Sequence, residues 1–183
     1  VKIGYEYSNQ ELMILAKYET DEFNRYEAGQ QFALKEMRAN ILRAKKDETL
    51  IISDDYLSAY ESYLFDEKMD SSLRTYALGL PDFDILTESD EVIDFENSWN
   101  VREFFLKTIA EKYEEKFLSL YNQLNIETDY SIGPKEIARR SLKNKALSYL
   151  LIANSSKYLE LAEKQYFQSN NMTDALAAYE SMA

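Results

Sequence analysis

Histidine and cysteine are both absent from the 183 residues of this sequence. The absence of thiols excludes disulfide bonds and thiol catalysis. The absence of imidazoles excludes the zinc-binding helix with the pattern His-Glu-x-x-His, in which two imidazoles one turn apart bind a single metal ion. No carboxylates stand at a recognisable ligand spacing either. We therefore expect neither catalytic residues nor metal ligands in this chain, and its substrate-binding residues stay unassigned at this level.

Residues that break helices are scarce, with four glycines and two prolines. A β-rich protein with many tight turns needs more of both, so the composition favours helices. Hydrophobic residues make up 45% of the chain, which excludes a disordered polypeptide. No apolar run approaches about 18 residues, so we expect no membrane span. The opening residues 1–7 are interrupted by charge and do not resemble a signal peptide.

Positive charge is also scarce, because 21 lysines and arginines face 33 aspartates and glutamates, for a formal net charge of −12. Nucleic-acid binding requires a positive surface that replaces the counterions of phosphates. Binding to anionic membranes requires positive charge too. The balance argues against both partners and favours a soluble protein, and the lack of cysteine suits the cytoplasm.

Apolar residues recur with helical spacing along most of the chain, which predicts eight or nine helices. Short connections between them favour antiparallel hairpins stacked in sequence, so the expected fold class is all-α, an α-solenoid or superhelical array. A short strand is expected at residues 2–7, where Ile3, Tyr5 and Tyr7 alternate with other residues. The expected helical ranges are 8–18, 21–44, 53–68, 71–79, one turn within 81–95, 97–124 with a break at 110–113, 134–153, 154–168, and a last helix from Thr173.

Capping signals support several of these boundaries. Ser8 and Glu11 form a capping box, and Pro134 stands at a first helical position. Gly29 lies inside the second helix, where glycine costs roughly 1 kcal/mol relative to alanine, so we expect a close helix crossing there. The apolar side expected for that helix comprises Phe23, Tyr26, Phe32, Met37, Ile41 and Leu42.

Two charged clusters have simple interpretations. The acidic residues of 82–96 lack the glycine that a calcium loop of the EF-hand type needs at its sixth position, so we interpret them as a solvated connection. A basic cluster lies within one helix, and we expect it to pair with the chain's own excess carboxylates. Its members are Lys135, Arg139, Arg140, Lys143 and Lys145.

Three further segments are distinctive. Residues 21–28 contain Phe-Asn-Arg-Tyr-Glu-Ala, residues 137–150 contain paired arginines, an Asn and a Leu-x-Tyr-Leu ending, and residues 171–178 begin with Asn-Met-Thr-Asp. In this order they resemble the C-terminal helical region of the bacterial aminopeptidase N family, zinc metallopeptidases of the gluzincin group. Tyr26 replaces the family's usual Trp. Residues 1–7 resemble the end of the family's small β-sandwich domain, and residues 8–183 resemble part of its helical domain.

The resemblance implies a non-catalytic portion of a longer enzyme that removes N-terminal amino acids from peptides. In the family, zinc held by two histidines and a glutamate activates water, a separate glutamate acts as base, and acidic residues hold the free amine. These residues would precede Val1, and the family's helical domain would continue beyond Ala183. The implied partners are the catalytic domain of the same longer chain and, for the whole enzyme, peptides. The fragment would cover the catalytic chamber, limit peptide access and be inactive alone.

Two other interpretations stay open. A free-standing helical scaffold would bind a protein partner along a concave face, and a helical regulator would bind a small hydrophobic ligand among the aromatic residues. The coding sequence upstream of Val1 distinguishes the free-standing scaffold from the aminopeptidase interpretation, because only the enzyme carries His-Glu-x-x-His there. An excised domain also exposes apolar surface and an unpaired strand, which would favour dimers of the isolated chain.

Overall fold

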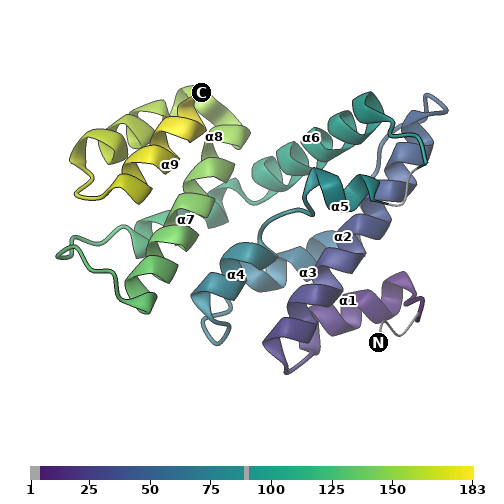
Figure 1. The fold of residues 1–183 in the computed structure, drawn as a ribbon, viewed down its shortest axis with the longest axis horizontal. Helices are drawn as coiled ribbons and strands as arrows, with labels where there is room; N and C mark the ends of the chain where they lie inside the picture. Colours follow the sequence, from purple (N-terminus) through teal and green to yellow (C-terminus); the bar gives the residue numbers. More distant parts are fainter. Residues whose placement is uncertain (1–4, 89–90) are drawn as a thin grey trace.

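The computed structural model describes residues 5–88 and 91–183, and these residues form helices and connections without a strand (Figure 1). The helices are α1 (Asn9–Tyr18), α2 (Glu22–Ala44), α3 (Asp54–Leu64), α4 (Ser71–Ala77), α5 (Phe83–Thr87), α6 (Phe95–Lys112), α7 (Glu114–Leu124), α8 (Pro134–Gln168) and α9 (Met172–Met182). No helix in the described part of the chain is both long enough and apolar enough to cross a membrane.

Two long helices organise the array. The 23-residue α2 contacts α1, α3, α4, α5 and α6, and the 35-residue α8 contacts α4, α6, α7 and α9. Neighbours in sequence pack as hairpins, so the chain progresses from α1 at one end to α9 at the other (Figure 1). One continuous hydrophobic core joins the helices. The expected all-α array of stacked hairpins is confirmed.

Several predicted helix boundaries are confirmed by their capping contacts. The Ser8 hydroxyl accepts a hydrogen bond from the Glu11 amide, and the Glu11 carboxylate accepts from the Ser8 amide at 2.8 Å, so the capping box is complete. Asp21 caps α2 in the same way by accepting from the amide of Asn24 at 2.9 Å. The predicted break before residue 114 falls at Tyr113, whose φ of −113° interrupts the helix between α6 and α7.

Gly29 marks the close crossing that its place inside a helix predicted. A Cβ atom at this position would lie 2.5 Å from the hydroxyl oxygen of Tyr63 on α3. That hydroxyl donates to the carbonyl oxygen of Arg25 at 3.0 Å, so the tyrosine occupies the space left by the missing side chain. Glycine therefore lets α2 and α3 approach each other closely.

Some expectations about helix ends need correction. The third helix ends at Leu64 rather than Lys68, because the Arg74 side chain binds the carbonyl oxygens of Tyr63 and Leu64 and draws the chain into a turn. The fourth helix is capped by Asp70, whose carboxylate accepts from two backbone amides, rather than by a serine. The helices expected at 134–153 and 154–168 are the two arms of α8, which kinks where Asn154 leaves helical geometry.

Two further predictions, the apolar face of α2 and the N-terminal strand, are wrong in part. Phe23 and Leu42 are each 60% exposed. At 100° per residue, Phe23 lies about half a turn away from the fully buried Phe32, so helical spacing places it on the solvent side. Residues 5–7 have no regular secondary structure, and the rest of the expected strand lies outside the described residues.

Candidate functional site

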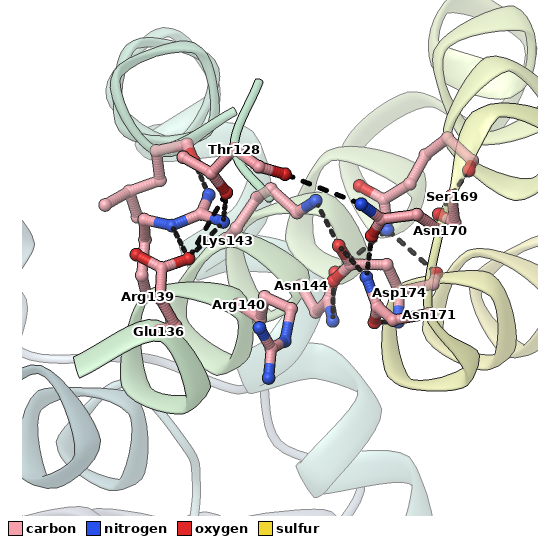
Figure 2. A network of polar contacts seen from close by, with 12 residues as sticks. Thr128, Glu136, Arg139, Arg140, Lys143, Asn144, Ser169, Asn170, Asn171 and Asp174 are labelled. Atoms are coloured by element: carbon pink, nitrogen blue, oxygen red, sulfur yellow. Dashed lines mark hydrogen bonds and ion pairs between the residues drawn. The ribbon is translucent and has the colours of Figure 1, made fainter. Parts of the chain in front are cut away.

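The second and third distinctive segments meet in space, where the first arm of α8 packs against the start of α9 (Figure 2). The Lys143 ammonium donates to Asp174 Oδ2 at 2.7 Å, and the Asn144 amide donates to Asp174 Oδ1 at 2.9 Å. The Lys143 and Asp174 side chains are only 6% and 8% exposed. A buried charge pair thus joins two segments that are about thirty residues apart in sequence.

Two more buried side chains complete this cluster. The Gln165 amide donates to Asn144 Oδ1 at 2.8 Å and to the backbone oxygen of Asp174 at 3.0 Å. The Tyr121 hydroxyl donates to Gln165 Oε1 at 3.0 Å. We call Tyr121, Lys143, Asn144, Gln165 and Asp174 the Asp174 network. It ties α7, both arms of α8 and α9 together, and a buried polar network of this kind is stable only when its members are hydrogen-bonded.

The electrostatics of the network favour an ionised Asp174 and a protonated Tyr121 near neutral pH. Burial by itself raises the pKa of Asp174, but the hydrogen bond and charge of Lys143, together with the amides of Asn171 and Asn144, outweigh burial and hold this pKa below its usual value. Burial and the nearby Asp174 charge raise the pKa of Tyr121 to about 12. Asp174 is therefore ionised, and Tyr121 remains a hydrogen-bond donor.

The paired arginines of the same segment hold the connection between α7 and α8. Arg139 donates to Glu136 Oε2 from Nε at 3.0 Å and from a terminal nitrogen at 2.8 Å, and it also binds the last carbonyl oxygen of α7, that of Leu124. Arg140 donates to the carbonyl oxygen of Ser131 at 2.9 Å, with its guanidinium 5.4 Å from the centre of the Tyr130 ring. The two side chains thus fix both ends of residues 125–133 on α8.

A polar cleft of about 550 Å³ lies between this connection, α8 and the α8–α9 turn. Three of its cations are engaged, because Arg139 and Lys143 form ion pairs and the 5% exposed Arg140 donates to a backbone oxygen. Lys164 also lines the cleft and forms no ion pair with a described residue. Arg140 Nε is one of two buried polar atoms without a partner among the described residues. The lining holds amides, hydroxyls and charged groups, but no thiol or imidazole that would act as a nucleophile or base.

The first distinctive segment forms a comparable junction at the other end of the array. Arg25 is 8% exposed and donates from Nε to the carbonyl oxygen of Ala16, near the end of α1, at 2.8 Å. Its guanidinium also pairs with Asp66, donates to the Ser62 hydroxyl at 3.1 Å and lies 5.0 Å from the centre of the Tyr63 ring. One arginine on α2 thereby connects α1, α2 and α3.

The basic cluster follows its expected pairing only in part. Arg139 and Lys143 pair with carboxylates of this chain, whereas Arg140 binds a backbone oxygen. Lys135 and Lys145 form no ion pair with any described residue. The described acidic residues of 82–96 do not gather as ligands, since no cluster of three or more histidine, cysteine, aspartate or glutamate side chains suited to a metal occurs among the described residues.

Comparison with known proteins gives relatives for nearly the whole chain. Residues 9–183 match the family described as "Domain of unknown function (DUF3458_C) ARM repeats". Over 178 residues, the chain is 32% identical to aminopeptidase N of Escherichia coli and 34% identical to aminopeptidase N of Haemophilus influenzae. Each of these alignments covers 97% of this chain and 20% of the relative, so the chain spans about a fifth of the relatives' length.

A solved structure shows the same fold. The crystal structure of Legionella pneumophila aminopeptidase A, in complex with aspartic acid, superposes with a TM-score of 0.80 at 26% sequence identity, over 97% of this chain and 21% of that one. The resemblance to the C-terminal helical region of aminopeptidase N is thus confirmed. With residues 9–183 matched throughout, the chain belongs to the DUF3458_C family of ARM-repeat domains.

Proposed function

We propose that this chain is the non-catalytic helical portion of a longer aminopeptidase, where it covers the catalytic chamber and limits which peptides enter. The observation that carries the proposal is the match of 97% of the chain to one fifth of aminopeptidase N from two bacteria. Residues 1–7 would be the end of a preceding β-sandwich domain, and residues 8–183 would belong to the helical domain. The lack of cysteine favours the cytoplasm as the compartment.

The roles of the family-like residues support a structural rather than a chemical part in the reaction. Arg25, Arg139 and the Asp174 network all engage helix ends or neighbouring helices. A residue that acts on substrate must present a free donor, acceptor or nucleophile to it. These side chains instead use their donors and acceptors within the array, where they hold neighbouring helices together and would keep a covering wall rigid.

Zinc would belong to the remainder of the longer enzyme. This sequence has no histidine, and the described residues include no cluster of carboxylates that fits the ion. When bound elsewhere in the enzyme, zinc would supply activated water, and the helical portion would contribute by excluding bulk water and positioning the peptide. We therefore propose that the isolated chain does not hydrolyse peptides.

An exposed aromatic patch is a suitable surface for docking onto the rest of the longer chain. Phe95 is 63% exposed and lies 4.9 Å from Phe83 and 6.3 Å from Trp99, measured between ring centres. Val92 and Ile93, just before α6, are 84% and 53% exposed. Contiguous apolar surface of this kind typically marks an interface, and the relatives extend far beyond the matched region.

The test begins with the coding sequence upstream of Val1, from which the longer protein can be produced. We expect that protein to cleave an alanyl-anilide substrate, and the pure 183-residue chain to be inactive. In the longer protein, Phe95→Glu should weaken docking and raise cleavage of long peptides relative to dipeptides. Phe65→Glu is the matched control, because Phe65 is 46% exposed but lies outside the aromatic patch.

Three results would count against the proposal. An upstream sequence without His-Glu-x-x-His would favour the free-standing scaffold. Zinc-dependent turnover by the pure 183-residue chain would contradict its non-catalytic role. Unchanged selectivity between long peptides and dipeptides in Phe95→Glu, with normal stability, would contradict the covering role of this face.

A further inference from the structure

A second cleft, of about 330 Å³, lies near the middle of the array. Residues of α2, α4, α5, α6 and α8 line it, so five helices contribute to one concave surface. It shares no lining residue with the cleft beside the Asp174 network. Neither the aminopeptidase relationship nor the proposed covering role assigns a function to it.

Two cations line this cleft from different helices without a carboxylate partner. Lys145 of α8 forms no ion pair with any described residue, although its side chain is half-buried. Arg102 of α6 makes one long contact, from Nε to the carbonyl oxygen of Pro81 at 3.5 Å. Burial, and then the positive charge of Arg102, lower the pKa of Lys145, while Asp82 opposes them. The two cations therefore repel each other across a space that would favour an anion.

Four other polar side chains of the cleft already donate to backbone oxygens. The Gln30 amide donates to the carbonyl oxygen of Gly79 at 2.9 Å, and the Thr75 hydroxyl donates to that of Ser71 at 2.8 Å. The hydroxyls of Ser148 and Tyr149 likewise donate to backbone oxygens. The charged donors of the cleft are thus the N–H groups of Lys145 and Arg102. The hydroxyls of Tyr26 and Tyr76 add neutral donors to the same lining, so the cleft suits a ligand that accepts hydrogen bonds.

The charge and shape of the cleft narrow the class of ligand. Asp82 is the single carboxylate in the lining, so with two cations the local charge is +1, which matches a monoanion better than a doubly charged phosphate. A carboxylate is planar and can accept two parallel bonds from a guanidinium. The rest of the wall is apolar or aromatic and includes Tyr26, Tyr76, Ile85, Leu106 and Ile152.

We propose that this cleft binds a small monocarboxylate attached to an apolar group, with Arg102 and Lys145 holding the carboxylate and the apolar wall holding the remainder. A volume of about 330 Å³ accommodates a molecule the size of one acylated amino acid. For about 12 non-hydrogen atoms at roughly 0.3 kcal/mol each, the dissociation constant should be on the order of millimolar.

The experiment titrates the ¹⁵N-labelled 183-residue chain with N-acetyl-leucine and follows its amide signals by NMR. We expect saturable shifts confined to the segments that line the cleft, which are residues 26–30, 75–85, 102–106 and 145–152. The matched ligand is N-acetyl-leucinamide, which has the same apolar group without the carboxylate. It should bind at least about tenfold more weakly, because the two charge-assisted hydrogen bonds are lost.

Three variants test the two cations. Lys145→Met and Arg102→Gln each remove one charge and keep the aliphatic stem of the side chain, and each should weaken binding of N-acetyl-leucine about tenfold. Lys107→Met is the control, because Lys107 lies on the same helix as Arg102 and is 69% exposed. It should leave the binding unchanged. Retained signal dispersion in α1 and α2 would verify that each variant is folded.

The carboxylate should also change the titration of its partner. A bound anion stabilises the ammonium form, so saturating N-acetyl-leucine should raise the pKa of Lys145 when its ¹³Cε signal is followed against pH. Equal binding of the acid and the amide would overturn the proposal. So would acid binding that survives both Lys145→Met and Arg102→Gln, or shifts that fall outside the cleft.

Discussion

Asp174→Asn should destabilise the protein strongly, because it removes one charge from a buried pair and leaves the other without compensation. Lys143 has a 6% exposed side chain, and its ammonium contacts Asp174 at 2.7 Å. Losing one partner of such a pair costs about 3–5 kcal/mol. The asparagine also presents an amide group toward the donors of Asn144 and Asn171, so at least one favourable contact becomes a contact between donors.

The expected loss is large enough to measure by urea unfolding. With a slope of about 2 kcal/mol per molar urea, a loss of about 3 kcal/mol lowers the midpoint by about 1.5 M. In a double variant, Lys143→Met with Asp174→Leu, both charges are gone and the part of the loss that comes from the unpaired charge should disappear, because apolar replacement of a whole buried pair is often neutral. The part that comes from the amide of Asn144, which loses its acceptor, should remain. Glu111→Gln is the control, since its pair with Lys107 is 3.9 Å long and exposed, and it should cost less than about 0.5 kcal/mol.

The same variant has a defined pH dependence. The pKa of Asp174 is lower in the folded protein than in the unfolded chain, so its contribution to stability is fully present above the unfolded pKa of about 3.9 and is lost as pH falls through the folded pKa. The stability difference between wild type and Asp174→Asn should therefore be constant near neutral pH. It should shrink at acidic pH, where wild-type Asp174 is protonated as well.

The helices that lose stability distinguish a disrupted Asp174 network from a general loss of packing. In a stacked array each helix is stabilised mainly by its neighbours, so α9 and the second arm of α8 should lose hydrogen-exchange protection first, while α2 keeps it. Wild-type stability in Asp174→Asn, or equal loss of protection in α2 and α9, would refute the reasoning that Asp174 joins the last helices.

Three smaller perturbations have expected outcomes as well. Gly29→Ala gains roughly 1 kcal/mol of helix propensity but drives a methyl group against the buried Tyr63. Thermal unfolding should therefore show a net loss of about 1–2 kcal/mol in stability, and a stabilised variant would contradict the close crossing. Arg25→Met removes the junction of α1, α2 and α3 and should cost about 2–3 kcal/mol in urea unfolding, with an unchanged midpoint counting against that role. The isolated chain should self-associate through the exposed side chains of Leu176 and Tyr179, which lie one turn apart on α9. Leu176→Glu should therefore shift sedimentation toward the monomer, and a wild-type chain that stays monomeric at high concentration would exclude this contact.

Several helix starts were predictable from sequence because they depend on neighbours in the chain. The capping box of Ser8 and Glu11, the cap at Asp21 and the proline at the start of α8 all act within one turn. Helix ends were less predictable when a distant side chain decides them. Arg74 ends α3 by binding the Leu64 carbonyl from ten residues away, and no local pattern indicates that contact.

The candidate site was predictable as segments but not as contacts. The resemblance selected residues 21–28, 137–150 and 171–178, and each contributes a buried polar junction. Tyr121 and Gln165 were missed because a single tyrosine or glutamine on a helix has no distinctive pattern. Their hydrogen bond joins positions 44 residues apart, so it follows from tertiary packing alone.

Lys143 and Lys145 show why a charge cluster in sequence does not specify one function. Two positions along a helix rotate a side chain by about 200°, so these lysines point to nearly opposite sides of α8. The side that carries Lys143 faces α9, where Lys143 pairs with Asp174. The side that carries Lys145 faces the cleft between α4, α5 and α6, where Arg102 adds a second positive charge. The excess of carboxylates in the whole chain predicts pairing on average. Only the folded positions of those carboxylates decide which lysine is paired and which is left for a ligand.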